Sequence, residues 1–186
     1  MPVSAFLPAA FLFGAAYGSA VPRHDSTATA LFAGGSFWCL EAALETVPGV
    51  DSAEAGYVYA GTDSAPPAPS FDAVVNGGSG YVEAVRVSYR PTRAGYGRIL
   101  DAYFRNIDPT RADGQFTDAG PEYRTLIFWS DAAQKQAAEK ARKRLAGSKR
   151  FAKPIVTEVK AASPFFRAER EHQDYARRNA VRYKAY

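Results

Sequence analysis

A short apolar run, two glycines and a helical pattern follow one another between residues 30 and 47. The run over 30–33 has the length and composition of a buried strand, and Gly34 and Gly35 mark a turn. Apolar residues then recur at the spacing of one helix face: Phe37, Leu40, Leu44 and Val47. The sequence therefore predicts a strand, a glycine turn and a helix over about 36–47, with Ser36 as the N-cap.

Alternating residues over 81–89 predict a strand that places Glu83 on the same face as Val85 and Val87. Glu83 is therefore expected to point toward the apolar side of its sheet. The other elements are predicted as strands near 52–58, 125–129 and 155–159, a helical turn near 71–75, a loop over 108–121, and helices over 96–107, 131–147 (with Ser130 as N-cap) and 168–178. Strands interleaved with helices favour the α+β class, as a two-layer α/β sandwich with helices packed on a mixed sheet.

The chain has 186 residues and is 47% apolar, which supports one domain with a substantial core, expected over 30–186. Residues 5–20 are almost wholly apolar but too short to span a bilayer comfortably, so no stable membrane insertion is expected. Small residues at Gly18 and Ala20 suit a signal peptidase, although no Lys or Arg precedes the apolar run. We expect a signal peptide over 1–20, a linker over 21–29 and a periplasmic or secreted protein; an uncleaved leader on a cytoplasmic protein is the alternative.

Positive charge gathers late in the chain, within residues 140–153 and 177–184, and the net charge is +4. The first group falls on an Ala-rich predicted helix, so we interpret it as a solvated helix face, and no nucleic acid is expected as a partner. Two histidines and one cysteine predict no metal site. His172 lies within a charged predicted helix and is expected at the surface or an interface.

The segment GGSFWCLE at 34–41 resembles the signature of the A-type methionine sulfoxide reductases, in which glycine, cysteine, phenylalanine and tryptophan are followed shortly by glutamate. Further segments resemble the family in the family's order: 48–50 (PGV), 80–85 (GYVEAV), 106–110 (NIDPT), 114–118 (GQFTD), 122–125 (EYRT), 153–158 (KPIVTE) and 172–175 (HQDY). The order of these segments over roughly 30–186, more than any single one, identifies the resemblance.

The resemblance implies an α/β roll around a ferredoxin-like plait and the activity of a peptide-methionine (S)-S-oxide reductase. In that family the helix-start cysteine attacks the sulfur of methionine-S-sulfoxide, free or in peptides, and becomes a sulfenic acid that thiols reduce. No cofactor is implied beyond an external thiol reductant such as thioredoxin, and a monomer is expected.

The resemblance also assigns roles to individual residues of this chain. Glu83 matches the acid that protonates the departing oxygen, while Tyr123 and Asp118 match polar groups near the substrate. Phe37, Trp38 and Phe71 match the aromatic wall around the sulfoxide methyl, and Phe71 lacks the hydroxyl that the family's tyrosine carries there. From residue type alone, Glu83 is also compatible with a partnered structural carboxylate, Asp118 with a turn residue, and Phe37 and Trp38 with core.

Ser36 occupies the position of the nucleophilic cysteine, and an alcohol can neither match a thiolate as a nucleophile nor form a sulfenic acid. Cys39 is the only thiol; its place near the helix start favours some thiolate character, while a small apolar residue is the plainer interpretation. The loop cysteine that some relatives place at Thr117 is absent. Three interpretations stay open: an engineered serine variant of an active reductase, a catalytically inactive homologue that binds oxidised methionine, and an enzyme in which Cys39 replaces the missing thiol.

Overall fold

The computed structural model describes residues 27–91 and 95–185, so the expected leader over 1–20 and most of the expected linker over 21–29 lie outside the described residues. The elements follow in the order β1 (Ala28–Ala33), α1 (Phe37–Glu45), β2 (Val50–Tyr59), α2 (Phe71–Val75), β3 (Tyr81–Tyr89), α3 (Tyr96–Arg105), β4 (Gly114–Gln115), β5 (Asp118–Ala119), the 3₁₀ turn η1 (Pro121–Tyr123), β6 (Leu126–Trp129), α4 (Ala132–Gly147), β7 (Glu158–Ala161), β8 (Phe165–Arg167), the 3₁₀ turn η2 (Arg170–His172), α5 (Tyr175–Arg178) and α6 (Ala180–Ala185).

The central sheet has the strand order β7-β6-β1-β3-β2-β8. Its inner strands β6, β1, β3 and β2 pair antiparallel, while β7 joins β6 in parallel and β8 joins β2 antiparallel. Strands β1 and β2 run in the same direction with β3 between them, so the chain must cross over, and α1 makes that connection. The sequence β1-α1-β2-β3-α3-β6 is the ferredoxin-like plait, and the mixed α+β architecture expected from the sequence is confirmed.

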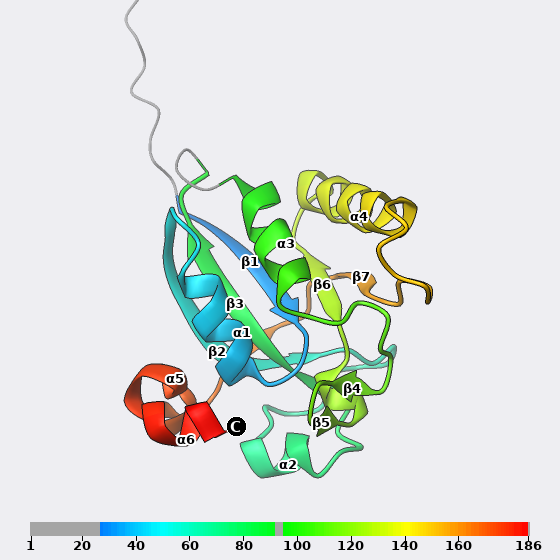
Figure 1. Ribbon diagram of the computed structural model, residues 1–186. Coiled ribbons are helices and arrows are strands. Elements are labelled where there is room, and N and C mark those ends of the chain that lie inside the picture. Colours follow the sequence, from blue (N-terminus) through cyan, green and yellow to red (C-terminus); the bar gives the residue numbers. More distant parts are fainter. Residues whose placement is uncertain (1–26, 92–94, 186) are drawn as a thin grey trace, which may run out of the picture.

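Helices α1 and α3 pack side by side on one face of the sheet, and α4 packs beyond α3 (Figure 1). The layer between helices and sheet is filled by large side chains that are almost fully buried: Phe32, Phe37, Leu40, Leu44, Ile99, Tyr103 and Ile127. The hydroxyl of Tyr103 donates to Ala33 O at 2.8 Å, so this buried polar group keeps a partner. The alternation of β3 turns Glu83 toward this layer, where Tyr81 and Val85 also lie.

The sheet closes into a roll because its two edge strands are joined by a very short connection. Strands β7 and β8 lie at opposite ends of the strand order, yet β7 ends at Ala161 and β8 begins at Phe165. Such a link reaches at most about 14 Å, whereas the edges of six flat strands would be about 24 Å apart. The inner face of the roll holds a second apolar cluster: Leu31, Ala33, Val58, Ala60, Val82, Ala84, Leu126 and Phe128.

Besides the last helix, three local predictions about the second half of the chain differ from the structure. The N-cap of α4 is Asp131 instead of Ser130, because the Asp131 carboxylate accepts from Gln134 N at 2.8 Å. The strand predicted over 155–159 begins only at Glu158, as β7, because Val156 N donates to Pro109 O outside the sheet, and the further strand β8 was not predicted. The predicted loop over 108–121 contains the small hairpin β4–β5 and the turn η1.

The predicted helix over 168–178 is a series of short pieces instead. Ala168 N donates to Ala55 O at 3.0 Å, which continues the pairing of β8 with β2. Asp174 then adopts φ +54°, in the left-handed region, so an α-helix cannot run through it. Helices α5 and α6 therefore lie as a separate compact unit beside α1, shown in red in Figure 1.

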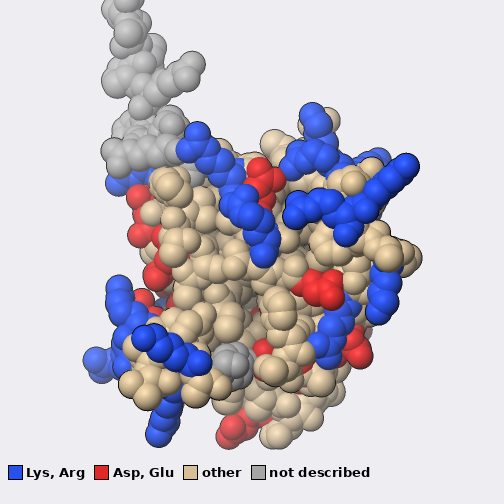
Figure 2. Space-filling model, in the orientation of Figure 1, with Lys and Arg blue, Asp and Glu red and all other residues tan. Residues whose placement is uncertain are grey.

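Lys and Arg side chains project from α4 into solvent, at the upper right of Figure 2. This is the arrangement of a solvated helix face. Among the residues that the structure describes, no helix is long and apolar enough to cross a membrane.

Candidate functional site

The turn between β1 and α1 requires glycine at Gly35. Its φ is +77°, and a Cβ there would lie 2.9 Å from the Cβ of Gln115. Gly35 N donates to Tyr123 O at 2.9 Å, which fixes the start of α1 against the turn η1. The local sequence thus brings two segments far apart in the chain, around Ser36 and around Tyr123, to one place.

Ser36 caps α1, as the sequence predicts. Its Oγ accepts from Trp38 N at 3.3 Å, and the residue is only 5% exposed. Ser36 also lines a hollow of about 280 Å³, the entry hollow, whose wall includes Cys39, Phe116, Asp118 and Tyr183. The residue at the family's nucleophile position therefore borders a space that a small ligand can enter.

Glu83 lies directly beneath the start of α1 and is 2% exposed, which confirms the predicted burial. Its Oε2 accepts from Phe37 N at 2.8 Å. Burial raises the pKa of Glu83 to about 8, against the opposing effect of the Phe37 N–H, and the charges of Asp118 and Glu122 add to the rise. Glu83 is therefore a protonated carboxyl at neutral pH, held at the first peptide of the helix.

Asp118 and Tyr123 both lie within electrostatic range of Glu83, so the structure brings the three predicted polar residues together. Tyr123 is half-buried; burial raises the pKa of its hydroxyl, and the charges of Glu83 and Asp118 raise it further. The hydroxyl is thus a hydrogen-bond donor across the physiological range of pH.

Glu122 belongs to the same group and was not singled out from the sequence. It is 5% exposed, and its Oε2 has no hydrogen-bond partner among the described residues. The adjacent Gly120 has φ +144°, and a Cβ there would lie 2.2 Å from Glu122 Oε1. No pattern in the local sequence indicates that this carboxyl is turned inward.

The predicted aromatic wall is present. The ring of Phe37 lies 6.2 Å from those of both Trp38 and Phe71, and Trp38 and Phe71 are stacked at 6.3 Å between centroids. Glu169 supports this wall from behind, since Phe71 N donates to its Oε1 at 3.0 Å and Tyr57 Oη to its Oε2 at 2.8 Å.

His172 and Tyr175 complete the wall, and His172, expected at the surface or an interface, is half-buried where the C-terminal segment packs against the wall. Its ring stacks on Phe71 at 4.2 Å, and its Nδ1 accepts from Trp38 Nε1 at 3.3 Å. The ring of Tyr175 stacks on that of Trp38, at 3.8 Å between centroids and 11° between planes. Two aromatic residues three positions apart in the motif HQDY were the signal for this contribution.

Residues 28–186 match the family described as peptide methionine sulfoxide reductase. The chain belongs to this family. The relative named peptide methionine sulfoxide reductase MsrA from Ligilactobacillus salivarius is 40% identical over 155 residues, which are 83% of this chain and 88% of the relative.

Solved structures of relatives share the fold. Reduced Mxr1 from Saccharomyces cerevisiae has a TM-score of 0.76 and 26% identity, over 83% of this chain and 86% of the yeast chain. Mxr1 in complex with Trx2 has a TM-score of 0.53 and 20% identity, over 81% and 85% of the two chains, and this second likeness shows the fold alone. By family, then, the chain is a peptide-methionine (S)-S-oxide reductase built on the ferredoxin-like roll.

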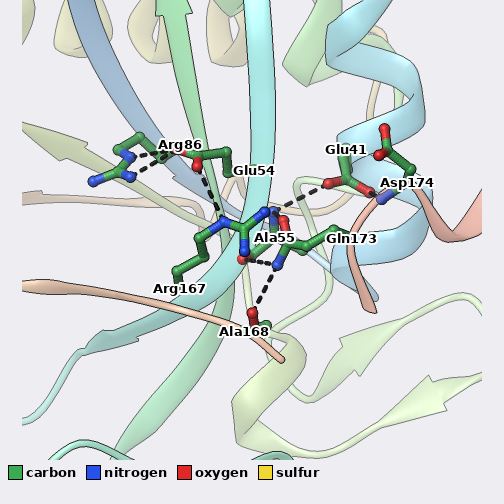
Figure 3. Close-up of polar contacts among 8 residues, drawn as sticks. All are labelled: Glu41, Glu54, Ala55, Arg86, Arg167, Ala168, Gln173 and Asp174. Carbon is green, nitrogen blue, oxygen red and sulfur yellow. Dashed lines mark hydrogen bonds and ion pairs between the residues drawn. The ribbon is translucent and has the colours of Figure 1, made fainter. Parts of the chain in front are cut away.

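In this member of the family, a buried polar network ties the C-terminal segment to the helix that carries Ser36 (Figure 3). Gln173 accepts from Ala55 N at 3.2 Å and donates to Ala55 O and Ala168 O at 2.9 and 3.0 Å. Glu41 of α1 accepts from Ala55 N at 3.2 Å and from Asp174 N at 2.9 Å. The position of His172 and Tyr175 against the aromatic wall rests on these bonds.

Cys39 lies in the first turn of α1 and is half-buried. Burial raises the pKa of its thiol, and a hydrogen bond with the Tyr183 hydroxyl only partly offsets this effect. Burial therefore opposes the thiolate character that a position near the helix start favours. No group of three or more His, Cys, Asp or Glu that could hold a metal occurs in the described part of the chain.

Proposed function

We propose that this chain recognises methionine-S-sulfoxide, free or in peptides, at the start of α1. One observation carries the proposal: the buried Glu83 carboxyl is held by Phe37 N–H next to Ser36, and its raised pKa of about 8 keeps it protonated. A protonated carboxyl can donate to the sulfoxide oxygen, and the Tyr123 hydroxyl is a second donor nearby.

The aromatic wall supplies the apolar side of the proposed site. The rings of Phe37, Trp38 and Phe71 lie with centroids 6.2 to 6.3 Å apart and with 20° to 46° between their planes. Apolar rings favour the sulfoxide methyl group over its oxygen. Donors on one side and rings on the other would orient the S-epimer and place the oxygen of the R-epimer against apolar carbon.

Reduction at this site requires a thiolate at the position of Ser36. The thiolate sulfur attacks the sulfoxide sulfur while the acid protonates the oxygen. The oxygen is then transferred to the cysteine sulfur, and the bonds that join the methionine sulfur to the oxygen and to the cysteine sulfur are broken. Methionine sulfur gains two electrons, and the thiolate is oxidised to a sulfenic acid. Two external thiols then restore the cysteine and release water and a disulfide.

Ser36 cannot carry out this step. The pKa of a thiol is about 8.5, and that of an alcohol lies many units higher. The oxygen counterpart of a sulfenic acid is a hydroperoxide, and a sulfoxide is too weak an oxidant to form one, so Ser36 cannot take up the oxygen atom. We therefore propose that the chain binds the sulfoxide without reducing it through Ser36, whose Oγ instead caps the helix.

A second function, reduction through Cys39, is favoured by one observation: Cys39 lines the same hollow as Ser36 and Asp118. Its raised pKa opposes this function, because little thiolate is present at neutral pH. The chain has one cysteine, so any sulfenic acid formed there would be reduced by an external thiol. The yeast relative Mxr1 forms a complex with Trx2, which supports a thioredoxin-like reductant for an active form of this chain.

Turnover with dithiothreitol separates these proposals. We compare the unaltered chain, Ser36→Cys, Cys39→Ala and the double variant on a methionine-S-sulfoxide peptide. The unaltered chain should be at least about a thousandfold slower than Ser36→Cys, because removing a nucleophile costs several kcal/mol of barrier. Equal rates would contradict the proposal, and residual turnover that disappears in Cys39→Ala would establish the second function.

Binding to the unaltered chain is measured by tryptophan fluorescence, with Trp38→Phe to show which ring responds. We expect millimolar affinity for the S-epimer, on the order of 4 kcal/mol, and weaker binding of the R-epimer. A signal indifferent to both epimers up to about 50 mM would remove sulfoxide recognition as the function.

A further inference from the structure

The entry hollow continues into a second hollow of about 420 Å³, the outer hollow. The two share Cys39, Asn106, Phe116 and Tyr183 as lining residues. The outer hollow then extends along α1, past Ala42 and Ala43, to Arg105 at the end of α3. A free amino acid whose sulfoxide reaches Ser36 would use only the first of the two spaces.

Phe116 forms the outer wall of both hollows and is 68% exposed, although it is an aromatic residue. It lies in the two-residue turn between Gln115 and Asp118, with φ +48°. This left-handed region favours glycine, so a phenylalanine here is both strained and solvated. Strain of this kind persists where the surroundings fix the backbone, and it gathers at ligand-binding sites.

The turn that carries Phe116 is fixed by neighbouring hydrogen bonds. Arg111 Nη1 donates to Phe116 O at 2.6 Å. The fully buried Gln115 accepts from Asp108 N at 2.7 Å and donates back to Asp108 O at 3.0 Å. The ring is therefore presented to solvent at the rim of the site by a supported backbone.

Arg105 brings a positive charge to the far end of the outer hollow. It is exposed, and its guanidinium has no hydrogen bond or ion pair with any residue in the described ranges. Elsewhere on α3, by contrast, Asp101 is paired with Arg144 at 2.9 Å. The outer hollow thus has the exposed ring of Phe116 near the entry hollow and the unpaired guanidinium of Arg105 beyond it.

We propose that the outer hollow binds the polypeptide that flanks an oxidised methionine, with an apolar side chain against Phe116 and an acidic side chain toward Arg105. This inference rests on the proposed sulfoxide recognition at the start of α1, where Ser36 borders the entry hollow. It adds the class of substrate: methionine sulfoxide in a chain with an apolar and then an acidic neighbour. The continuity of the two hollows supplies the path for the backbone. The exposed ring and the free guanidinium supply the selectivity.

The test measures the affinity of the unaltered chain for four ligands by calorimetry. The first is N-acetyl-methionine-S-sulfoxide amide, the minimal ligand. The others are peptides in which methionine-S-sulfoxide is flanked by glycines only, by Leu then Glu on the C-terminal side, or by Leu then Glu on the N-terminal side. We expect one of the two Leu–Glu peptides to bind about tenfold more tightly than the glycine peptide, since burying one Leu side chain supports a gain of this size.

Variants then assign that gain to the two residues. Phe116→Gly suits the backbone at φ +48° and should reduce the preference for the Leu–Glu peptide over the glycine peptide to about twofold or less. Arg105→Gln should remove the preference for Glu over Gln in the same peptide. Phe151→Ala and Arg150→Gln are the matched controls and should retain both preferences; they line the hollow between α3 and α4, which shares Arg105 but not Phe116 with the outer hollow, and neither residue lines the outer hollow.

The outcomes distinguish this inference from the function on which it rests. If the minimal ligand does not bind, sulfoxide recognition fails and the flanking site fails with it. If the minimal ligand binds but neither Leu–Glu peptide is preferred, or if the preference survives in Phe116→Gly, the flanking site alone is overturned.

Discussion

Ser36 and Glu83 both accept hydrogen bonds from the first turn of α1, one from Trp38 N and the other from Phe37 N. Helix N-termini present several N–H groups without intrahelical partners, and two of them are satisfied here by side chains. A thiol in place of the Ser36 hydroxyl accepts hydrogen bonds poorly, so Ser36→Cys should lower the free energy of unfolding by about 1 kcal/mol. Thermal unfolding of the two proteins at pH 7 checks this expectation, and an unchanged melting temperature would contradict it.

Glu83 should make the protein less stable as the pH rises. Its pKa is about 8 in the folded chain, against an ordinary value of 4.5, so the folded state holds a proton that the unfolded state releases. The free energy of unfolding therefore falls between about pH 4.5 and pH 8, by on the order of a few kcal/mol. Glu83→Gln keeps an acceptor for Phe37 N–H but cannot ionise, and should flatten this decline.

Urea unfolding from pH 5 to pH 8.5 measures the effect. Glu41 also has a raised pKa, of about 7, caused by its burial, so some slope should remain in Glu83→Gln. Glu139→Gln on α4 is the control and should follow the unaltered chain. Parallel curves for Glu83→Gln and the unaltered chain would show that Glu83 ionises normally in the folded state.

The burial of Glu83 could be predicted because a strand alternates its faces, so the local sequence already decides which side chains point inward. The contributions of His172 and Glu122 could not be predicted in the same way. His172 reaches the wall only because Gln173 is bonded to Ala55, a contact 118 residues away in the chain. The local periodicity of apolar residues carries no information about such a contact.

Among the elements, the C-terminal segment departs most from its predicted form. Helical spacing over 168–178 predicts one helix, yet Gln173 donates to Ala55 O and Ala168 O in place of lying on a helix face. Asp174 N donates to the buried Glu41 carboxyl and its backbone turns left-handed. Tertiary hydrogen bonds thus replace the helical ones that the spacing implies, and they place Tyr175 against Trp38.

Gln173→Ala should therefore loosen this segment and the aromatic wall together. Gln173 is 5% exposed and makes three hydrogen bonds with Ala55 and Ala168. Their loss, with a buried carbonyl left short of its donor, should cost about 2–3 kcal/mol of unfolding free energy. Trp38 emission should also shift, because Tyr175 no longer stacks on its ring. Gln136→Ala on the exposed face of α4 is the control; equal stability of the two variants would contradict this role.

At the scale of the whole molecule, the strands and helices could be predicted from periodicity, but the closure of the sheet could not. Nothing in the spacing of 155–159 indicates that β7 joins β6 in parallel, or that β8 begins four positions after β7 ends. Besides the short link between β7 and β8, a contact between β7 and the end of β2 supports the closure. Lys160 of β7 donates through Nζ to Ala60 O, 2.7 Å away, just beyond the end of β2.

Lys160→Met tests this closure, because methionine keeps an apolar chain of similar length and removes the donor. Ala60 O then retains only the Arg124 Nη2 donor, which lies 3.3 Å away. Hydrogen bonds from charged donors typically contribute about 1.5–3 kcal/mol, so the free energy of unfolding should fall by an amount in this range. The midpoint of urea unfolding should then lie at a lower urea concentration. The chain carries a net charge of +4, and losing one cation slightly reduces self-repulsion. Lys140→Met on exposed α4 removes the same charge without a hydrogen bond; if both variants unfold alike, Lys160 does not hold the roll closed.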